Sequence, residues 1–141
     1  MIKKCVVFLL VITVTLTIAS TCLATEPKEF VEQFFDKIKA GKITEGYDGL
    51  FAGSGISVLK PQAFQMLKMQ TAAVLPVYGS ILGFEKIREE KFGASLVRLV
   101  YILKSENGPT IWEFYFYKPR TNWFCDNVFF NDEFGHLERK E

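Results

Sequence analysis

Residues able to do acid–base chemistry are few in this chain, and most lie toward its C-terminal end. Tyr115 and Asp126 fall on neighbouring predicted strands, where we expect the two side chains side by side, with Glu113 and Arg98 near them. A carboxylate beside a phenol supplies a base and a hydrogen-bond donor for a developing oxyanion. Asp48, in the helical half, is a second candidate base. The same groups fit a rim of hydrogen bonds and ion pairs at a dimer interface, which is the interpretation we favour.

Other kinds of catalytic site find no support in the sequence. His136 is the only histidine and lies in a charged tail, which argues against histidine–carboxylate dyads, serine triads and a pair with Cys125. A single histidine, a single cysteine after residue 24 and no closely spaced carboxylates give no zinc or calcium motif. The glycines fit neither nucleotide-binding signature. We therefore expect no metal and no cofactor.

The first 24 residues have the three-part layout of a secretory signal peptide. Two lysines precede an apolar run over residues 5–18, and small residues lead to Ala24. The run is shorter than the roughly 20 residues that span a bilayer comfortably. We expect cleavage near Ala24 and export to the periplasm or the medium, with no membrane span after cleavage. Lipidation of Cys22 and an uncleaved anchor are the less favoured alternatives.

Removal of this segment leaves 117 residues, about the size of one domain. Because Lys3 and Lys4 are lost, 15 basic residues remain against 16 acidic ones, and the net charge becomes −1. This balance gives no case for nucleic acid or an anionic membrane surface as a partner. Cys125 is then a lone cysteine, for which we expect a buried, inert thiol. An intermolecular bridge or a reactive thiol is the alternative.

The rest of the chain predicts helices first and strands second. One helix begins at Pro27 and stops at Gly41, and Thr44 caps a short second helix that runs to about Phe51. A third helix starts at Pro61 and is ended or kinked by Pro76. Strands with a period of two follow over residues 84–92, 94–104, 111–118 and 123–130. Residues 25–134 thus form one α+β domain, and residues 135–141 form a charged tail.

The turns fix the expected register of the sheet. Hairpins closing at Asn107-Gly108 and at Arg120-Thr121 give one face with almost no charge, which we expect to point inward. This face supplies the floor of a candidate pocket for an apolar ligand, and two tyrosines of the helical half close over it. The candidate residues are Tyr47, Tyr78, Tyr101, Trp112, Phe114, Cys125 and Asn127. They fit a plain hydrophobic core as well, and we favour the core.

Both faces of the predicted sheet carry large apolar side chains. The outer face holds Val100, Tyr115, Val128 and Phe130 beside its charges, and Phe129 points inward. Three short helices cover only one face of such a sheet. We expect a second copy of the chain to cover part of the other face, which predicts a homodimer through the outer sheet face.

Several short motifs lead into the predicted sheet and through it: Tyr78-Gly79, Leu82-Gly83-Phe84-Glu85, residues 96–101, residues 112–119, Trp123 and residues 129–132. With the order of the elements, they resemble the nuclear-transport-factor-2-like superfamily, and most closely its small exported bacterial members of unassigned activity. The resemblance spans most of residues 26–134. It implies a cone-like α+β fold with a curved antiparallel meander sheet, a pocket between helices and sheet, and pairing through the outer face.

Two functions from different classes remain open, because this superfold hosts isomerases, dehydratases, cyclases and binding modules. The favoured hypothesis is an exported, non-enzymatic domain that binds a small apolar ligand or a protein partner. The alternative is a cofactor-free isomerase or dehydratase that uses Asp126 or Asp48 with a tyrosine such as Tyr115. The alternative requires a carboxylate that points into a closed apolar cavity. An inhibitor or immunity-type partner that acts by surface contact is a third possibility.

Overall fold

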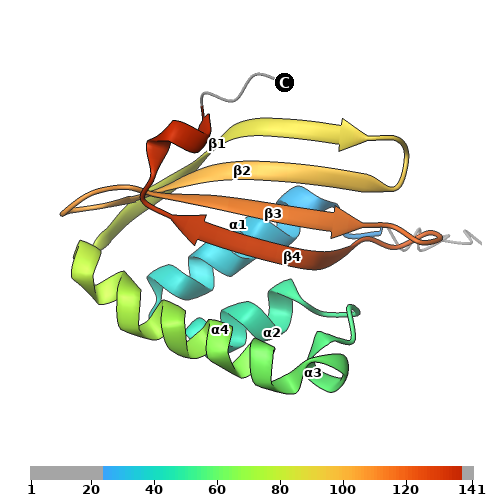
Figure 1. Ribbon diagram of the computed structural model, residues 1–141, viewed down its shortest axis with the longest axis horizontal. Coiled ribbons are helices and arrows are strands. Elements are labelled where there is room, and N and C mark those ends of the chain that lie inside the picture. Colours follow the sequence, from blue (N-terminus) through green and yellow to red (C-terminus); the bar gives the residue numbers. More distant parts are fainter. Residues whose placement is uncertain (1–23, 138–141) are drawn as a thin grey trace, which may run out of the picture.

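Helices come first in the chain, and they form a layer on one side of a sheet in the computed structural model, which describes residues 24–137 (Figure 1). The proposed signal peptide lies outside the described residues except for Ala24. The helical elements are α1 (Pro27–Lys39), α2 (Ile43–Leu50), α3 (Ile56–Leu59) and α4 (Pro61–Val74), which continues into the 3-10 turn η1 (Leu75–Tyr78). Within residues 24–137, no helix is long and apolar enough to cross a membrane.

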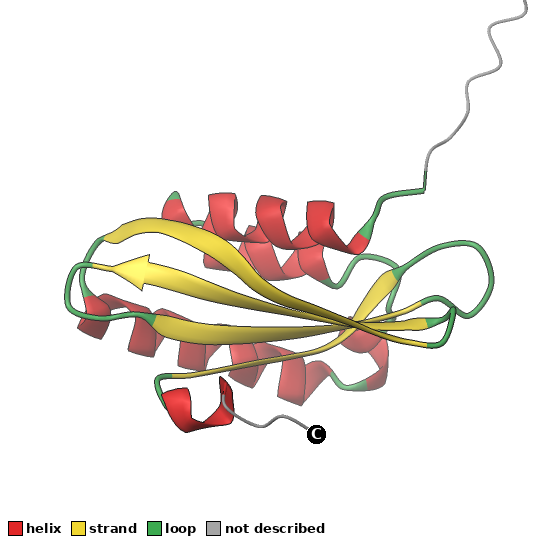
Figure 2. Cartoon of the chain, turned by 90° about the horizontal axis from the view of Figure 1, so that it is seen from above, coloured by secondary structure: helices red, strands yellow, loops and turns green. Residues whose placement is uncertain are grey.

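The sheet is an antiparallel meander in the order β1-β2-β3-β4. Its strands are β1 (Ile81–Phe92), β2 (Leu96–Ser105), β3 (Thr110–Tyr117) and β4 (Phe124–Asn131). Figure 2 looks down onto the sheet and shows the strong twist of the strands in front of the helices. The predicted α+β class, with N-terminal helices on a meander sheet, is confirmed.

Helix α1 forms where the sequence predicts it, for local reasons. Pro27 stands in its first turn, and the buried residues Val31, Phe34, Phe35 and Ile38 recur at helical spacing along one face. The helix ends before Gly41, whose φ of +76° is a left-handed conformation that glycine adopts without strain.

The helices that follow depart from the prediction in two places. Thr44 does not cap α2, because the helix already begins at Ile43 and Lys42 occupies the N-cap position. The short helix α3 was not predicted. It follows a local turn in which the Ser54 hydroxyl donates to the Phe51 carbonyl over 2.8 Å and accepts from the Ile56 N–H over 3.2 Å.

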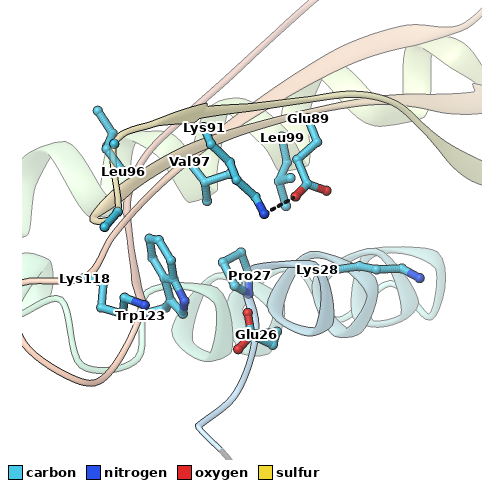
Figure 3. Close-up of a pocket in the computed structure, with 12 residues that line it drawn as sticks. Glu26, Pro27, Lys28, Glu89, Lys91, Leu96, Val97, Leu99, Lys118 and Trp123 are labelled. Carbon is cyan, nitrogen blue, oxygen red and sulfur yellow. Dashed lines mark ion pairs between the residues drawn. The ribbon is translucent and has the colours of Figure 1, made fainter.

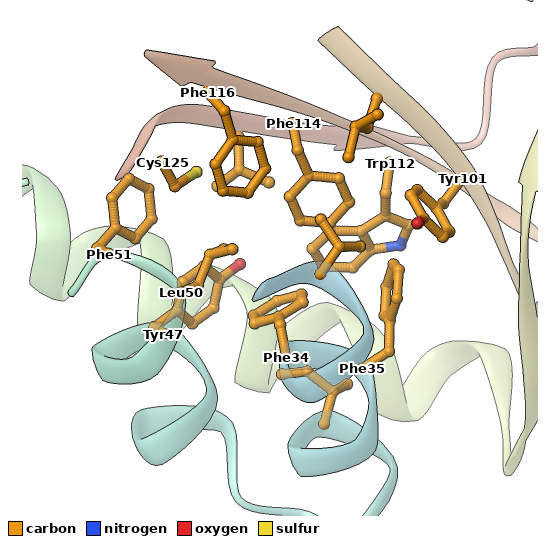
Figure 4. Packing of buried hydrophobic residues seen from close by; sticks show 14 of the residues in the cluster. Phe34, Phe35, Tyr47, Leu50, Phe51, Tyr101, Trp112, Phe114, Phe116 and Cys125 are labelled. Carbon is orange, nitrogen blue, oxygen red and sulfur yellow. The ribbon is translucent and has the colours of Figure 1, made fainter. Parts of the chain in front are cut away.

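The core lies between α1 and the inner face of the sheet. Phe34 packs on Trp112 with ring centroids 5.5 Å apart, and Phe35 packs on Phe114 at 5.6 Å (Figure 4). Burial of each such side chain stabilises the fold by about 1.5–3 kcal/mol. The nearly uncharged face of β2 and β3 is therefore the inner one, as predicted.

The hairpin between β2 and β3 closes at Glu106-Asn107, one residue before the predicted Asn107-Gly108, and this shifts the cross-strand pairing by two residues. Tyr101 faces Trp112 rather than Phe114, and the turn runs from Ser105 to Gly108. Contacts from outside the hairpin favour this turn, because the Asn107 N–H donates to the Tyr78 carbonyl over 2.8 Å. A shift of two residues keeps every side chain on its predicted face.

The hairpin between β3 and β4 begins in the predicted register, and the register then changes at a β-bulge. Phe116 faces Cys125 as predicted, but Tyr115 faces Asn127, so Asp126 is an extra residue in β4. The assignment of the next residues was therefore wrong: Val128 and Phe130 lie inward, whereas Asn127 and Phe129 do not. Burial of apolar groups explains the change, since the Phe130 ring stacks on Trp112 at 4.4 Å.

The outer face of the sheet is partly covered by the chain itself. The 3-10 turn η2 (Phe134–Leu137) lies on the side of the sheet opposite the helices (Figure 1), and the Arg88 guanidinium donates to the Leu137 carbonyl over 2.8 Å. Part of the predicted charged tail is thus ordered against the sheet. Phe92 and Tyr117, at the other end of this face, are 47% and 40% exposed. The homodimer through this face stays a prediction.

Candidate functional site

Five of the seven predicted pocket residues lie together, but they lie inside the packed core. Tyr47, Tyr101, Trp112, Phe114 and Cys125 are all at most 1% exposed. The ring of Phe34 contacts those of Tyr47, Trp112 and Phe114, with centroids 5.0–5.8 Å apart (Figure 4). The space that a pocket would need between these helices and the sheet therefore holds phenylalanine side chains.

The other two predicted pocket residues lie elsewhere. Tyr78 belongs to η1, and its hydroxyl donates to the Asp132 carboxylate over 2.9 Å. This hydrogen bond, followed by burial and the charge of Asp132, raises the pKa of Tyr78. Asn127 follows the bulge and is exposed. Neither residue closes over the floor formed by Trp112 and Phe114.

The carboxylates of the enzymatic alternative do not have the geometry that it requires. Asp48 lies at the edge of a hollow of about 390 Å³ between α2, α3 and α4, but its side chain is 55% exposed and paired with Lys68 over 2.6 Å. Asp126 is the exposed bulge residue. An acid in contact with water and a lysine is not poised as a base in an apolar cavity.

Tyr115 faces Asn127 rather than Asp126, so the predicted pairing with Asp126 is wrong, and Tyr115 lies among cross-strand ion pairs instead. The Arg98 guanidinium pairs with Glu90 over 2.8 Å and with Glu113 over 2.9 Å, and the Tyr115 hydroxyl donates to Glu113 over 3.4 Å. Burial is the largest cause that raises the pKa of Tyr115, and the charges of Glu113 and Glu90 add to it. This arrangement matches the rim of hydrogen bonds and ion pairs expected from the sequence.

Thiol chemistry and metal binding are the remaining kinds of chemistry to consider. Cys125 is buried, as predicted, and burial raises the pKa of its thiol, so the sulfur stays neutral. Its thiol donates to the Asn127 carbonyl over 3.4 Å. Among residues 24–137, no group of three or more histidine, cysteine or acidic side chains is arranged to hold a metal ion.

Two buried phenols differ in their hydrogen bonding. The Tyr47 hydroxyl lies 2.7 Å from the Thr71 hydroxyl, and Tyr47 is the donor, because Thr71 gives its single proton to the Leu67 carbonyl over 2.9 Å. Tyr101 has a buried hydroxyl without a partner in the described part of the chain. Burial raises the pKa of Tyr101 to about 12, and the nearby charges of Glu32 and Glu89 contribute.

A cleft of about 340 Å³ opens at the end of the molecule where α1 begins. The β1–β2 turn and the loop between β3 and β4 meet the start of α1 there, and Figure 3 shows Pro27 and Trp123 opposite Val97 and Leu99. The apolar lining consists of Pro27, Ala94, Leu96, Val97, Leu99 and Trp123. The charged lining consists of Glu26, Lys28, Glu89, Lys91 and Lys118.

Contacts across the rim hold the lining in place. The Lys118 N–H donates to the Ser95 carbonyl over 2.8 Å, which ties the β3–β4 loop to the turn between β1 and β2. The Lys118 ammonium lies 4.7 Å from the centroid of the Trp123 ring, a cation–π distance. This cleft combines apolar and aromatic lining residues with charged side chains at its rim, so it is our candidate functional site.

The chain is similar in fold to a solved structure. One structure, from Campylobacter jejuni and named "Putative NTF2-like transpeptidase", superimposes with a TM-score of 0.57 over 72% of this chain and 97% of its own length, at 9% sequence identity. The fold is NTF2-like. No family model matches the sequence, and neither does any curated protein. At this identity the likeness shows the fold alone.

The NTF2-like fold confirms the architecture that the resemblance implied, but the cleft does not lie where the sequence placed a pocket. None of the seven predicted pocket residues lines it. Its lining comes from three stretches far apart in the chain, residues 26–28, 89–99 and 118–123, and most of its residues are ordinary lysines, glutamates and aliphatic side chains. Sequence reasoning missed this cleft, and the signal that could have indicated it is Trp123, a tryptophan beside a predicted turn.

Proposed function

We propose that this NTF2-like chain is an exported, non-enzymatic domain that binds a small molecule with an apolar body in the cleft beside Trp123. The observation that carries the proposal is the cleft itself, in which Pro27, Val97 and Trp123 offer apolar surface around about 340 Å³ of space. That volume is at the lower end of the range for small-molecule sites.

The chemistry of the described residues supports binding rather than catalysis. Asp48 and Asp126, the two candidate bases, are both exposed, and the Cys125 thiol is buried and neutral. An apolar lining with a few charged groups at its rim suits recognition of a ligand by shape and charge. Export is the part of the proposal that rests on the sequence of residues 1–24 alone.

Native mass spectrometry of the protein purified from its source cell envelope tests this function. We expect extra mass that leaves on denaturation and an N-terminus near Thr25. Ala94→Phe places a ring in the cleft and is expected to abolish the extra mass, whereas Ala73→Phe, on an exposed position of α4, is the matched control. A wild-type protein that is empty and binds no apolar probe would contradict the proposal and favour a protein-contact role.

A further inference from the structure

We propose that the ligand of the Trp123 cleft carries an anionic group, which the Lys118 ammonium binds while the apolar body lies against Trp123 and Val97. The inference rests on the proposed function, because it concerns the chemical class of ligand at the same site. It goes further by assigning a charge to the ligand and a role to one lysine.

Most charged side chains at the rim of the cleft already have partners. Lys28 is engaged by Glu32 over 3.5 Å and extends away from Trp123 (Figure 3). Glu89 accepts from Lys86 over 2.7 Å, and this hydrogen bond is the largest cause that lowers the pKa of Glu89, so Glu89 stays ionised and already has a lysine partner. The Lys91 ammonium also contacts the Glu89 carboxylate, but at 4.0 Å this ion pair is long.

Among the described residues, Lys118 lacks the carboxylate partner that the other two rim lysines, Lys28 and Lys91, have. In the described part of the chain, its ammonium contacts the Trp123 ring and pairs with no carboxylate. A lysine over an indole keeps its full charge, since an aromatic quadrupole attracts a cation without neutralising it. Glu26 is the acidic lining residue that opposes this charge. The cleft therefore presents a positive charge next to apolar surface.

The position of Lys118 determines what kind of molecule fits. Because its backbone is fixed to Ser95 and its ammonium stays near the indole, an anion bound there would hold the rest of a small molecule against the apolar lining. A volume of about 340 Å³ favours a compact body, such as one aromatic ring or a short branched chain. Carboxylates, phosphates and sulfonates share the required charge, and the experiment separates them.

The test uses pairs of probes that share one apolar body and differ in charge. Isothermal titration of the purified protein with 4-phenylbutyrate and with 4-phenylbutanol measures the effect of the carboxylate, and phenyl phosphate against phenol measures that of a phosphate. We expect at least one anion to bind about tenfold or more tightly than its neutral partner. The preference should weaken as salt is raised, because an exposed charge pair is screened.

Variants assign the preference to the residue. Lys118→Met keeps an unbranched side chain and is expected to lower the affinity for the anion to that of the neutral probe, with little change for the neutral probe. Glu26→Gln is expected to strengthen anion binding, since it removes the opposing charge. Lys39→Met, at the exposed end of α1 and outside the cleft, is the control and should leave both affinities unchanged.

The outcomes separate this inference from the function on which it rests. Equal binding of charged and neutral probes by the wild type overturns the inference and leaves the cleft as an apolar binding site. A charge preference that survives Lys118→Met also overturns it, because the anion then binds elsewhere. No binding of any probe overturns the proposed function as well.

Discussion

Replacement of Tyr101 and Tyr47 by phenylalanine, one at a time, compares two phenols that differ in one respect. Both side chains are at most 1% exposed and both pack against core aromatic rings. The Tyr47 hydroxyl donates to Thr71 over 2.7 Å, whereas the Tyr101 hydroxyl is buried without a partner in the described residues. Each substitution removes one oxygen and leaves the ring in place.

The expected effects on the free energy of unfolding have opposite signs. Tyr47→Phe removes a made hydrogen bond, while Thr71 keeps its bond to the Leu67 carbonyl, so the fold loses about 1 kcal/mol. Tyr101→Phe removes a polar group that costs about 1–3 kcal/mol to bury unpaired, so the fold gains a similar amount. The two variants should therefore differ by about 2–4 kcal/mol.

Urea unfolding followed by far-ultraviolet circular dichroism measures the difference. Equal m-values in both variants would show that only stability has changed. For a domain of this size, 1 kcal/mol moves the melting temperature by about 4 °C, so thermal unfolding gives a second measurement. If Tyr101→Phe destabilises the protein as much as Tyr47→Phe does, the Tyr101 hydroxyl has a hydrogen-bond partner in solution and the reasoning is refuted.

Three further predictions concern pH, the thiol and the assembly. Burial raises the pKa of Tyr101 to about 12, whereas a tyrosine in the unfolded chain ionises near pH 10. The free energy of unfolding should therefore fall as pH rises from about 10 to 12. Urea unfolding should show a less steep fall in the Tyr101→Phe variant. Cys125 should be inert to dithionitrobenzoate in the folded protein and reactive in urea; rapid labelling without denaturant would contradict its burial. In sedimentation velocity we expect a homodimer that Phe92→Asp or Tyr117→Asp dissociates, with Val58→Asp, on the helical side, as control; a monomeric wild type would rule it out.

The end of the outer face that holds Phe92 and Tyr117 is suited to the predicted dimer contact. Phe92, Leu96, Tyr117 and Phe124 face one another in register across all four strands, and they form an apolar row. In the next row the charge of Arg98 is neutralised within the chain by Glu90 and Glu113. A second copy related by a two-fold axis would thus meet an apolar row without facing an unpaired like charge.

The sequence predicted those elements that local interactions determine. Pro27, the spacing of Val31, Phe34, Phe35 and Ile38, and the stop at Gly41 all act within one helix, so α1 was found with correct ends. The inner face of β2 and β3 was found because a period of two is also local. The register of β2 with β3 was not predicted correctly, because the position of the turn depends on the contact of Asn107 with Tyr78, which belongs to another part of the chain.

The bulge shows how a single residue limits such predictions. Every inference about β4 beyond Cys125 assumed uninterrupted pairing, and the extra residue Asp126 reversed the faces of Asn127, Val128, Phe129 and Phe130. The reversal brings Phe130 onto Trp112 and leaves the polar Asn127 in solvent, so it follows from burial. A pattern of alternating residues does not reveal where this exchange becomes favourable.

The location of the cleft follows from how the aromatic residues are used. Phe34 and Phe35 are adjacent in sequence, and because α1 lies along the sheet both rings reach Trp112 and Phe114. These rings fill the space in which the sequence placed a ligand. At the start of α1, Phe30 still reaches Phe116, with ring centroids 5.7 Å apart, but Pro27 is a short residue, and a cleft remains between Pro27, Trp123 and the edge of the core at Val97. The same amphipathic helix thus fills the interior along its length and leaves the candidate cleft beside Pro27.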